Sequence, residues 1–393
     1  MTISAVSGRA VGGVVALLLL FAASASLLEL TSESDTASTA TGPGPPFVPD
    51  DPGWTGTSRG WAQAQWNFLT PSGVDAPGAW ANLIAAGAPG GRGVTVAVLD
   101  TGVAYPTDDP SRPGSPDFAV SQFVPGYDFV DNDTEPYDPN GHGTHVAATI
   151  AERTDNGAGL TGLAYGVRLL PVRVLDRTEE GDAATIARGV RYAVGHGAQV
   201  INLSLNFGGN ANPAALVALA DALDEAHDDG TLVVVGAGNA SAATLAEPAA
   251  MTHVLAVGAT TDTGCLASYS NHGPGLDLVA PGGGADANVA DDPHCQIGRR
   301  GSPVYQVTLA DPRLAAFDEV GYVGTSMAAP HVAATAALVI ASGVLGPRPT
   351  PDAVQQRLEQ TARDLGPPGY DTVYGWGLVD AATATAPGPP GRP

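Results

Sequence analysis

The sequence predicts an α/β fold of three layers, in which a mostly parallel sheet carries helices on both faces. Short apolar runs rich in Val, Ile and Leu alternate along the chain with Ala-rich segments of helical spacing. Continuous apolar strands separated by helices are typical of a parallel sheet that is covered on both faces. The chain has 393 residues and is 44% apolar, so it can bury a large core. We expect one domain over residues 61–385.

The expected elements follow one another along that domain. We expect strands over residues 94–100, 167–176, 199–205, 231–239 and 252–260. We expect helices over residues 145–152, 183–197, 211–230 and 331–342, the last of them buried. Sites in sheets of this kind form at the carboxyl ends of the strands.

The two ends of the chain have a different composition. Arg9 precedes an uncharged run over residues 10–28, and Ala23-Ser24-Ala25 is a small-x-small cleavage signal. This pattern predicts a signal peptide over residues 1–25 and therefore a secreted protein, in the extracellular space or the cell envelope. An uncleaved membrane anchor over residues 10–28 is the alternative. Residues 26–60 are predicted to be a disordered linker or short pro-segment, and residues 386–393 a disordered tail.

Charge and cysteine content exclude several classes of function. The chain has 40 acidic and 17 basic residues, a formal net charge of −23, and all 17 basic residues are Arg. Such a chain lacks the clustered cations that nucleic acids and anionic membrane surfaces require. Two cysteines, Cys265 and Cys295, lie close to or within residues 282–320. In an exported protein they can form a disulfide, and two free buried thiols are the alternative.

Three residues with catalytic potential lie at expected element ends. Asp100 closes the first strand in VAVLDTGV, His142 lies in NGHGTHVA where a helix begins, and Ser326 lies in GTSMAAPH just before the last buried helix. Each alone is a common structural feature, such as a cap or a loop residue. Together they have the chemistry of a triad, because His142 can take a proton from Ser326 while Asp100 orients its ring. We expect Pro330 in the first helical turn, where its missing N–H is not needed.

With their flanking residues, these positions resemble the subtilases, the subtilisin-like serine proteases, in the order Asp, His, Ser. The matching strings run from about Gln65 to Ala382: DTG, GHGTHVA, INLSL, GAGN, LVAPGG, GTSMAAPHVA and YGWGLVDAA. The resemblance implies a monomeric serine endopeptidase that forms an acyl-enzyme with a protein or peptide substrate. A peptide-binding pseudoprotease and a membrane-anchored maturation protease with a narrow substrate are the alternatives.

The resemblance also implies a set of binding residues. Asn239 matches the second oxyanion donor of the family, although an Asn in this position can also be a simple turn residue. Ser204, Leu205 and Asn206 match the strand that pairs with the substrate backbone. The floor of the specificity pocket is matched by Gly236, Ala237 and Gly238. These small residues leave space for a bulky apolar substrate side chain.

Two segments suggest structural calcium. Asp128, Asp131, Asp133 and Glu135 share a turn-rich loop with the oxygen density that Ca²⁺ prefers. This run resembles the calcium loop of thermitase-type subtilases, which adds the carbonyl of Tyr137. A solvated acidic loop is the alternative.

The second candidate resembles the strong calcium site of subtilisins. The matching side chains are Gln65, Asp117 and Asn156, with carbonyls near Thr154, Ala158 and Leu160. The loop after Asp100 is longer than usual, so Asp108 or Asp109 could take the place of Asp117.

Overall fold

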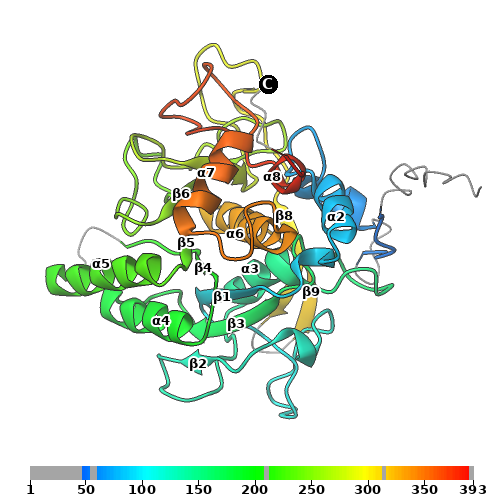
Figure 1. Cartoon of the computed structure of the whole chain (residues 1–393), viewed down its shortest axis with the longest axis vertical. Coiled ribbons are helices and arrows are strands. Elements are labelled where there is room, and N and C mark those ends of the chain that lie inside the picture. The colour runs from blue at the N-terminus through cyan, green and yellow to red at the C-terminus, as the bar shows by residue number, and fades with distance from the viewer. Residues whose placement is uncertain (1–46, 54–59, 208–211, 312–315, 389–393) are drawn as a thin grey trace, which may run out of the picture. The chain divides into compact units, whose positions relative to one another are not determined.

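A sheet of seven strands forms the centre of the computed structural model, which describes residues 47–53, 60–207, 212–311 and 316–388 (Figure 1). These residues fall in one compact unit, residues 45–393. Every neighbouring pair in the sheet runs parallel, in the order β2-β3-β1-β4-β5-β6-β7. The strands are β1 (Thr95–Asp100), β2 (Tyr127–Asp128), β3 (Arg168–Arg173), β4 (Val200–Leu203), β5 (Leu232–Gly236), β6 (Leu255–Thr260) and β7 (Leu278–Pro281).

Helices cover the sheet on both sides and form two separate apolar cores. Successive β1 side chains alternate between them, since Val96 and Val98 join one core while Ala97 and Leu99 join the other. The first core contains residues of α2 (Ala76–Ala85), α3 (His142–Ala151), α6 (Thr325–Ser342), α7 (Pro351–Thr361) and α8 (Ala381–Thr385). The second contains residues of α4 (Ala183–Gly195) and α5 (Pro213–Asp228), which lie together at one side in Figure 1. The three-layer α/β fold is therefore confirmed.

Short segments complete the chain. They are α1 (Trp61–Ala64) and the 3₁₀ turns η1 (Trp66–Phe68), η2 (Pro89–Gly91) and η3 (Val120–Gln122). An antiparallel hairpin, β8 (Val304–Asp311) with β9 (Ala316–Tyr322), begins within the 282–320 stretch, ends two residues beyond it and was not expected. Cys265 and Cys295 form a disulfide.

The two catalytic-segment helices begin earlier than expected. Helix α3 begins at His142 and α6 at Thr325, each directly after a glycine with positive φ: Gly141 at 112° and Gly324 at 155°. Ser326 therefore lies in the first turn of α6 instead of before the helix. Pro330 lies inside α6, so its expected place in the first turn was wrong.

Parts of the segments expected to be disordered pack on the domain. Phe47 contacts Trp80 edge-to-face with ring centroids 5.9 Å apart, and the carbonyl of Pro49 accepts from Trp61 Nε1 at 2.9 Å. These aromatic partners give residues 47–53 the apolar contacts that their own composition lacks. At the other end, Arg357 donates to the carbonyls of Ala386 and Gly388. The predicted signal peptide, its anchor alternative and the last five residues lie outside the described residues.

One described helix, α6, is long and apolar enough to cross a membrane. Its 18-residue window is 78% buried inside the domain, as expected for a core helix.

Candidate active site

The order in which the chain adds strands to the sheet reverses at β1, so the carboxyl end of β1 is a topological switch point. Strands β2 and β3 lie on one side of β1, and β4 to β7 lie on the other. Asp100 ends β1, the segment from Ser204 follows β4, and Gly236 ends β5. Because parallel strands end at one edge, this topology brings the predicted residues to one place.

Asp100 and His142 form a direct pair at this edge. His142 Nδ1 lies 2.7 Å from Asp100 Oδ1, which also accepts from the Thr101 N–H at 2.7 Å. Asp100 is fully buried. Glycine is required after the histidine, because a Cβ at Gly143 would overlap the carbonyl oxygen of Gly102. The start of α3 can therefore approach the end of β1 closely enough for the pair to form.

A residue that the sequence analysis missed holds His142 in position. Buried Asp138 accepts hydrogen bonds from the backbone N–H groups of Asn140, Gly141 and Thr144. Its carboxylate also accepts from the hydroxyls of Thr101 and Thr144. Asp138 thus joins the end of β1 to the start of α3. An acid four residues before a histidine is too common to have been singled out from the sequence.

The environment of His142 favours its protonated form. Burial opposes the charge, but the adjacent Asp100 carboxylate outweighs burial, and Glu179 and Asp138 add to the effect. The net result raises the pKa of His142 to about 9. An imidazolium formed when His142 accepts a proton is therefore stabilised.

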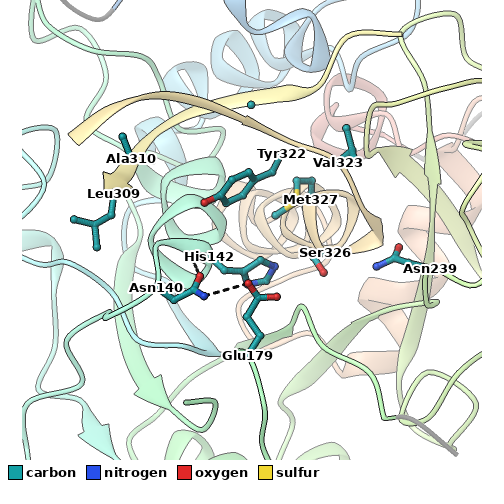
Figure 2. Close-up of a pocket in the computed structure, with 11 residues that line it drawn as sticks. Asn140, His142, Glu179, Asn239, Leu309, Ala310, Tyr322, Val323, Ser326 and Met327 are labelled. Atoms are coloured by element: carbon teal, nitrogen blue, oxygen red, sulfur yellow. Dashed lines mark hydrogen bonds between the residues drawn. The ribbon is translucent and has the colours of Figure 1, made fainter. Parts of the chain in front are cut away.

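Ser326 and His142 line one cavity of about 580 Å³ (Figure 2). Ser326 Oγ donates to the carbonyl of Ser204 at 3.2 Å, and the Ser204 hydroxyl donates to the carbonyl of Ser326 at 2.8 Å. Asn202 Nδ2 donates in turn to Ser204 Oγ at 2.9 Å. Among the described residues no hydrogen bond joins Ser326 to His142.

Asn239 lines the same cavity, and its orientation is fixed. Its Oδ1 accepts from the Thr325 N–H at 2.9 Å and from the Thr325 hydroxyl at 3.0 Å. With the oxygen held there, the amide Nδ2 faces Ser326 across the cavity (Figure 2). The Asn239 amide and the Ser326 N–H, in the first turn of α6, can therefore stabilise negative charge at one point.

The β8–β9 hairpin forms the opposite rim of the cavity, through Leu309, Ala310, Tyr322 and Val323 (Figure 2). Buried His145, on α3, fixes it. His145 Nε2 lies 3.0 Å from the carbonyl of Val304 and 3.2 Å from that of Val320, and its ring stacks on Tyr322 at 4.7 Å. Burial lowers the pKa of His145 to about 3, so it stays neutral.

The predicted substrate-binding residues lie beside this cavity and do not line it. Ser204 and Leu205 are buried after β4, and Asn206 is exposed. Gly236 ends β5, and Ala237 accepts from the Ala246 N–H at 2.9 Å. Gly238 has φ of 107° and donates to the Thr325 hydroxyl. These contacts keep both segments next to Thr325 and Ser326.

In the first calcium candidate, arginine side chains already pair with most of the acidic side chains. Arg173 donates to Asp128 at 2.7 Å and to Asp131 at 2.6 Å, and Arg112 pairs with Glu135. Asp133 accepts from the backbone of Glu135, and the Tyr137 hydroxyl donates to the carbonyl of Pro113. Three of the four acids of this loop, Asp128, Asp131 and Glu135, are therefore paired with guanidinium groups.

The second calcium candidate does assemble, with two further acids. Asn156 Nδ2 donates to Asp117 Oδ1 at 2.8 Å, and burial raises the pKa of Asp117 to about 7. Buried Asp51 accepts from the backbone of Asp155 and Asn156. Gln65 Oε1 accepts from the N–H of Thr161.

Glu152 is the second added acid. It is fully buried, and neither of its carboxylate oxygens makes a well-formed hydrogen bond among the described residues, although the Val307 backbone and the Asp117 carboxyl lie close to it. Burial, with nearby Asp117, raises its pKa well above the ordinary value. The two alternatives to Asp117, Asp108 and Asp109, are both exposed, and Asp109 accepts from the Ser111 N–H in its own turn. Within the described part of the chain, no three His, Cys, Asp or Glu side chains converge in a ready metal geometry.

Comparison with known proteins agrees with this fold and geometry. The sequence profile of the subtilase family matches residues 91–377. The chain therefore belongs to the subtilase family, and by class it is a serine-type endopeptidase.

Two similar proteins and one similar solved structure show how far the similarity extends. A thermophilic serine proteinase of Bacillus sp. (strain AK1) is 35% identical over 295 residues, which are 75% of this chain and 62% of that protein. Subtilisin Savinase of Lederbergia lenta is 38% identical over 75% of this chain and 91% of its own length. The solved structure of a protease from Pseudoalteromonas arctica PAMC 21717 superposes with a TM-score of 0.67 at 31% identity, covering 86% of this chain and 98% of that one.

Proposed function

We propose that this protein is a secreted endopeptidase that hydrolyses peptide bonds through an acyl-enzyme on Ser326. The carrying observation is the Asp100–His142 pair at 2.7 Å in one cavity with Ser326 and the oriented Asn239 amide. His142 takes the Ser326 proton as Oγ attacks the peptide carbonyl, and it then gives that proton to the leaving amine. Water repeats the sequence on the acyl-enzyme, releasing the acid and regenerating Ser326.

Asp100 and Asn239 stabilise the charges that form during the reaction. Asp100 accepts from His142 Nδ1–H and so holds the neutral ring in the tautomer whose Nε2 can act as a base. Once His142 has taken the proton, the Asp100 carboxylate stabilises the imidazolium. The Asn239 amide and the Ser326 N–H meet the oxyanion of the tetrahedral intermediate. For the first step the Ser326 hydroxyl must leave the Ser204 carbonyl and turn toward His142.

We also propose how the substrate lies. The chain on the acyl side of the scissile bond pairs with Ser204–Asn206, and the side chain of the attacked residue enters beside Gly236–Gly238. Small residues there favour a bulky apolar side chain. A peptide library with strong preference for acidic or basic residues at that position would contradict this assignment.

Structural calcium is proposed at the second candidate only. Asp117, Asn156, Gln65 and Asp51 supply hard oxygens, and the two orphaned Glu152 oxygens lie in the same acidic cluster. The ion would neutralise buried carboxylates whose pKa values are raised in its absence. The Asp128 loop fits less well because Arg173 already binds its acids.

Export is proposed from the charge and hydropathy pattern of residues 1–25. N-terminal sequencing of material recovered from culture medium tests it. A chain that stays in the membrane fraction with residues 10–28 intact would favour the anchored maturation protease instead.

Active-site labelling tests the chemistry directly. A fluorophosphonate should label the wild type and not Ser326→Ala, because only an activated serine reacts. Casein hydrolysis by the wild type separates a broad endopeptidase from a narrow one. A folded wild type that is neither labelled nor active would be a pseudoprotease, and the proposed function would be wrong.

A further inference from the structure

Glu179 brings a carboxylate into the catalytic cavity that the proposed mechanism does not use. It lines the cavity together with Asn140 and His142, and Figure 2 shows its side chain beside the His142 ring. Its Oε1 accepts from Asn140 Nδ2 at 3.2 Å, while Asn140 Oδ1 accepts from the N–H of His142 at 2.9 Å. The Asn140 side chain therefore connects Glu179 to the backbone of the catalytic histidine by two hydrogen bonds.

The loop that carries Glu179 is closed on itself. Asp176 Oδ1 accepts from the Thr178 N–H at 2.7 Å and from the Glu180 N–H at 3.1 Å, and the Asp176 N–H donates to the Glu180 carbonyl. Glu179 has φ of 64°, a left-handed conformation that Gly or Asn adopts more readily than Glu. The sequence thus keeps a glutamate where backbone geometry favours another residue, which indicates a use for its side chain.

The charge of Glu179 has no counterion among the residues that the structure describes. No Arg or His of the described chain forms an ion pair with it, and its side chain is exposed. The nearby titratable groups are His142, buried Asp138, Tyr322 on the hairpin rim, and Asp176, Arg177 and Glu180 of its own loop. A cationic ligand would supply the missing partner.

The topology indicates which part of a substrate reaches Glu179. The Glu179 loop follows β3 and Ser204–Asn206 follows β4, and these strands flank β1. A peptide paired with Ser204–Asn206 therefore passes between that segment and the Glu179 loop, at the end of β1. The residue before the attacked one then lies next to His142 and Glu179.

We propose that Glu179 is a specificity residue that binds an Arg or Lys side chain at the substrate position preceding the attacked residue. This inference rests on the proposed function and adds a substrate class to it. A guanidinium can meet a carboxylate through two parallel hydrogen bonds, which gives Arg an advantage over Lys. The net charge of −23 further favours encounter with cationic substrates.

Quenched peptides that differ only at this position test the proposal. We expect kcat/KM for Arg to exceed that for Gln by about fivefold at low salt, and Glu to fall below Gln. Added NaCl should shrink the ratio, because an exposed charge pair is screened. Glu179→Gln should bring the Arg-to-Gln ratio near one, and Glu179→Arg should favour the Glu peptide.

Glu180→Gln is the matched control, since it removes the same charge from the same loop outside the cavity lining. The assays are run above pH 10, where His142 is neutral in every variant. Equal rates on the Arg and Gln peptides in the wild type, or a ratio that survives Glu179→Gln, would overturn the inference. Fluorophosphonate labelling and casein hydrolysis by the same preparation show separately whether the proposed function stands.

Discussion

The carbonyl of Ser326 depends on Ser204 because of where Pro330 lies. In a helix this carbonyl would accept from the N–H four residues on, but residue 330 is a proline without an N–H, and its ring crowds that carbonyl. The Ser204 hydroxyl donates to it at 2.8 Å instead. Ser204→Ala therefore removes a donor next to the nucleophile without touching the triad.

The magnitude follows from the cost of an unsatisfied buried acceptor. That cost is about 1–3 kcal/mol, and about 1.4 kcal/mol is a factor of ten. We expect kcat of Ser204→Ala to fall about tenfold with KM little changed, since the backbone carbonyl of residue 204 that faces the substrate is kept. Ser204→Thr retains a hydroxyl and is the control. Steady-state kinetics on a chromogenic peptide and a thermal unfolding curve measure both effects.

A double-mutant cycle tests whether Ser204 acts through the Ser326 carbonyl. Pro330→Ala restores the missing N–H, so Ser204→Ala should cost less in that background, with a coupling energy of about 1 kcal/mol. The same loss in both backgrounds would show that Ser204 does not act through the Ser326 carbonyl. An unchanged kcat in Ser204→Ala alone would have the same meaning.

Four further outcomes are expected. Asn239→Ala should fold normally and lose about 10²–10³ in kcat, a magnitude taken over from the measured subtilisin oxyanion Asn, and full activity would remove Asn239 from the mechanism. The acid limb of kcat/KM should lie near pH 9, because His142 must lose its proton to act as a base; a limb near pH 6.5 would contradict the Asp100 pairing. EDTA should lower the Tm of the wild type and not of Asp117→Asn, and no wild-type shift would exclude the calcium site. Replacing both cysteines with Ala should destabilise the fold by about 3–4 kcal/mol through the 30-residue loop, measured by urea unfolding.

The pH dependence of stability has the opposite sign to that of activity. His142 has a folded-state pKa of about 9, above its ordinary value of 6.5. The pairing with Asp100 therefore stabilises the fold fully below about pH 6.5, and this contribution is lost as pH rises through 9. The enzyme is expected to gain activity over the range in which it loses this part of its stability.

The local sequence was sufficient to predict the strands and helices whose apolar residues recur in a regular pattern. The five expected strands all occur, with at most three residues trimmed from either end, because each is buried on both faces and needs continuous apolar residues. Helices α4 and α5 carry side-chain caps from Asp182 and Asn212, a local signal. Helices α3 and α6 begin directly after glycines with positive φ, which local periodicity does not mark, so both starts were expected too far along the chain.

Features that depend on distant contacts could not be predicted. Asp51 reaches the Asp117 cluster only because residues 47–53 fold back on the 153–161 loop, where Gly53 pairs with Gly159. Glu152 reaches it because the end of α3 lies beside Asp117, whose carbonyl accepts from the Arg153 N–H. Arg173 reaches the Asp128 loop from the end of β3, 45 residues later. An acidic run has the same local pattern whether its partner is a metal or an arginine, so the sequence left both open.

The acidic residues of the two calcium candidates and of the catalytic cavity differ in how their charge is balanced. Asp128 and Asp131 are paired with Arg173, so their charge is cancelled inside the protein. Asp51, Asp117 and Glu152 are buried together, where burial raises their pKa values and a cation would be accommodated. Among the described residues that line the catalytic cavity, Glu179 is the one acid, and it is exposed with an unpaired charge. The net charge of the whole chain acts on the rate at which charged substrates are encountered, whereas an exposed, unpaired carboxylate in the cavity acts on one substrate side chain.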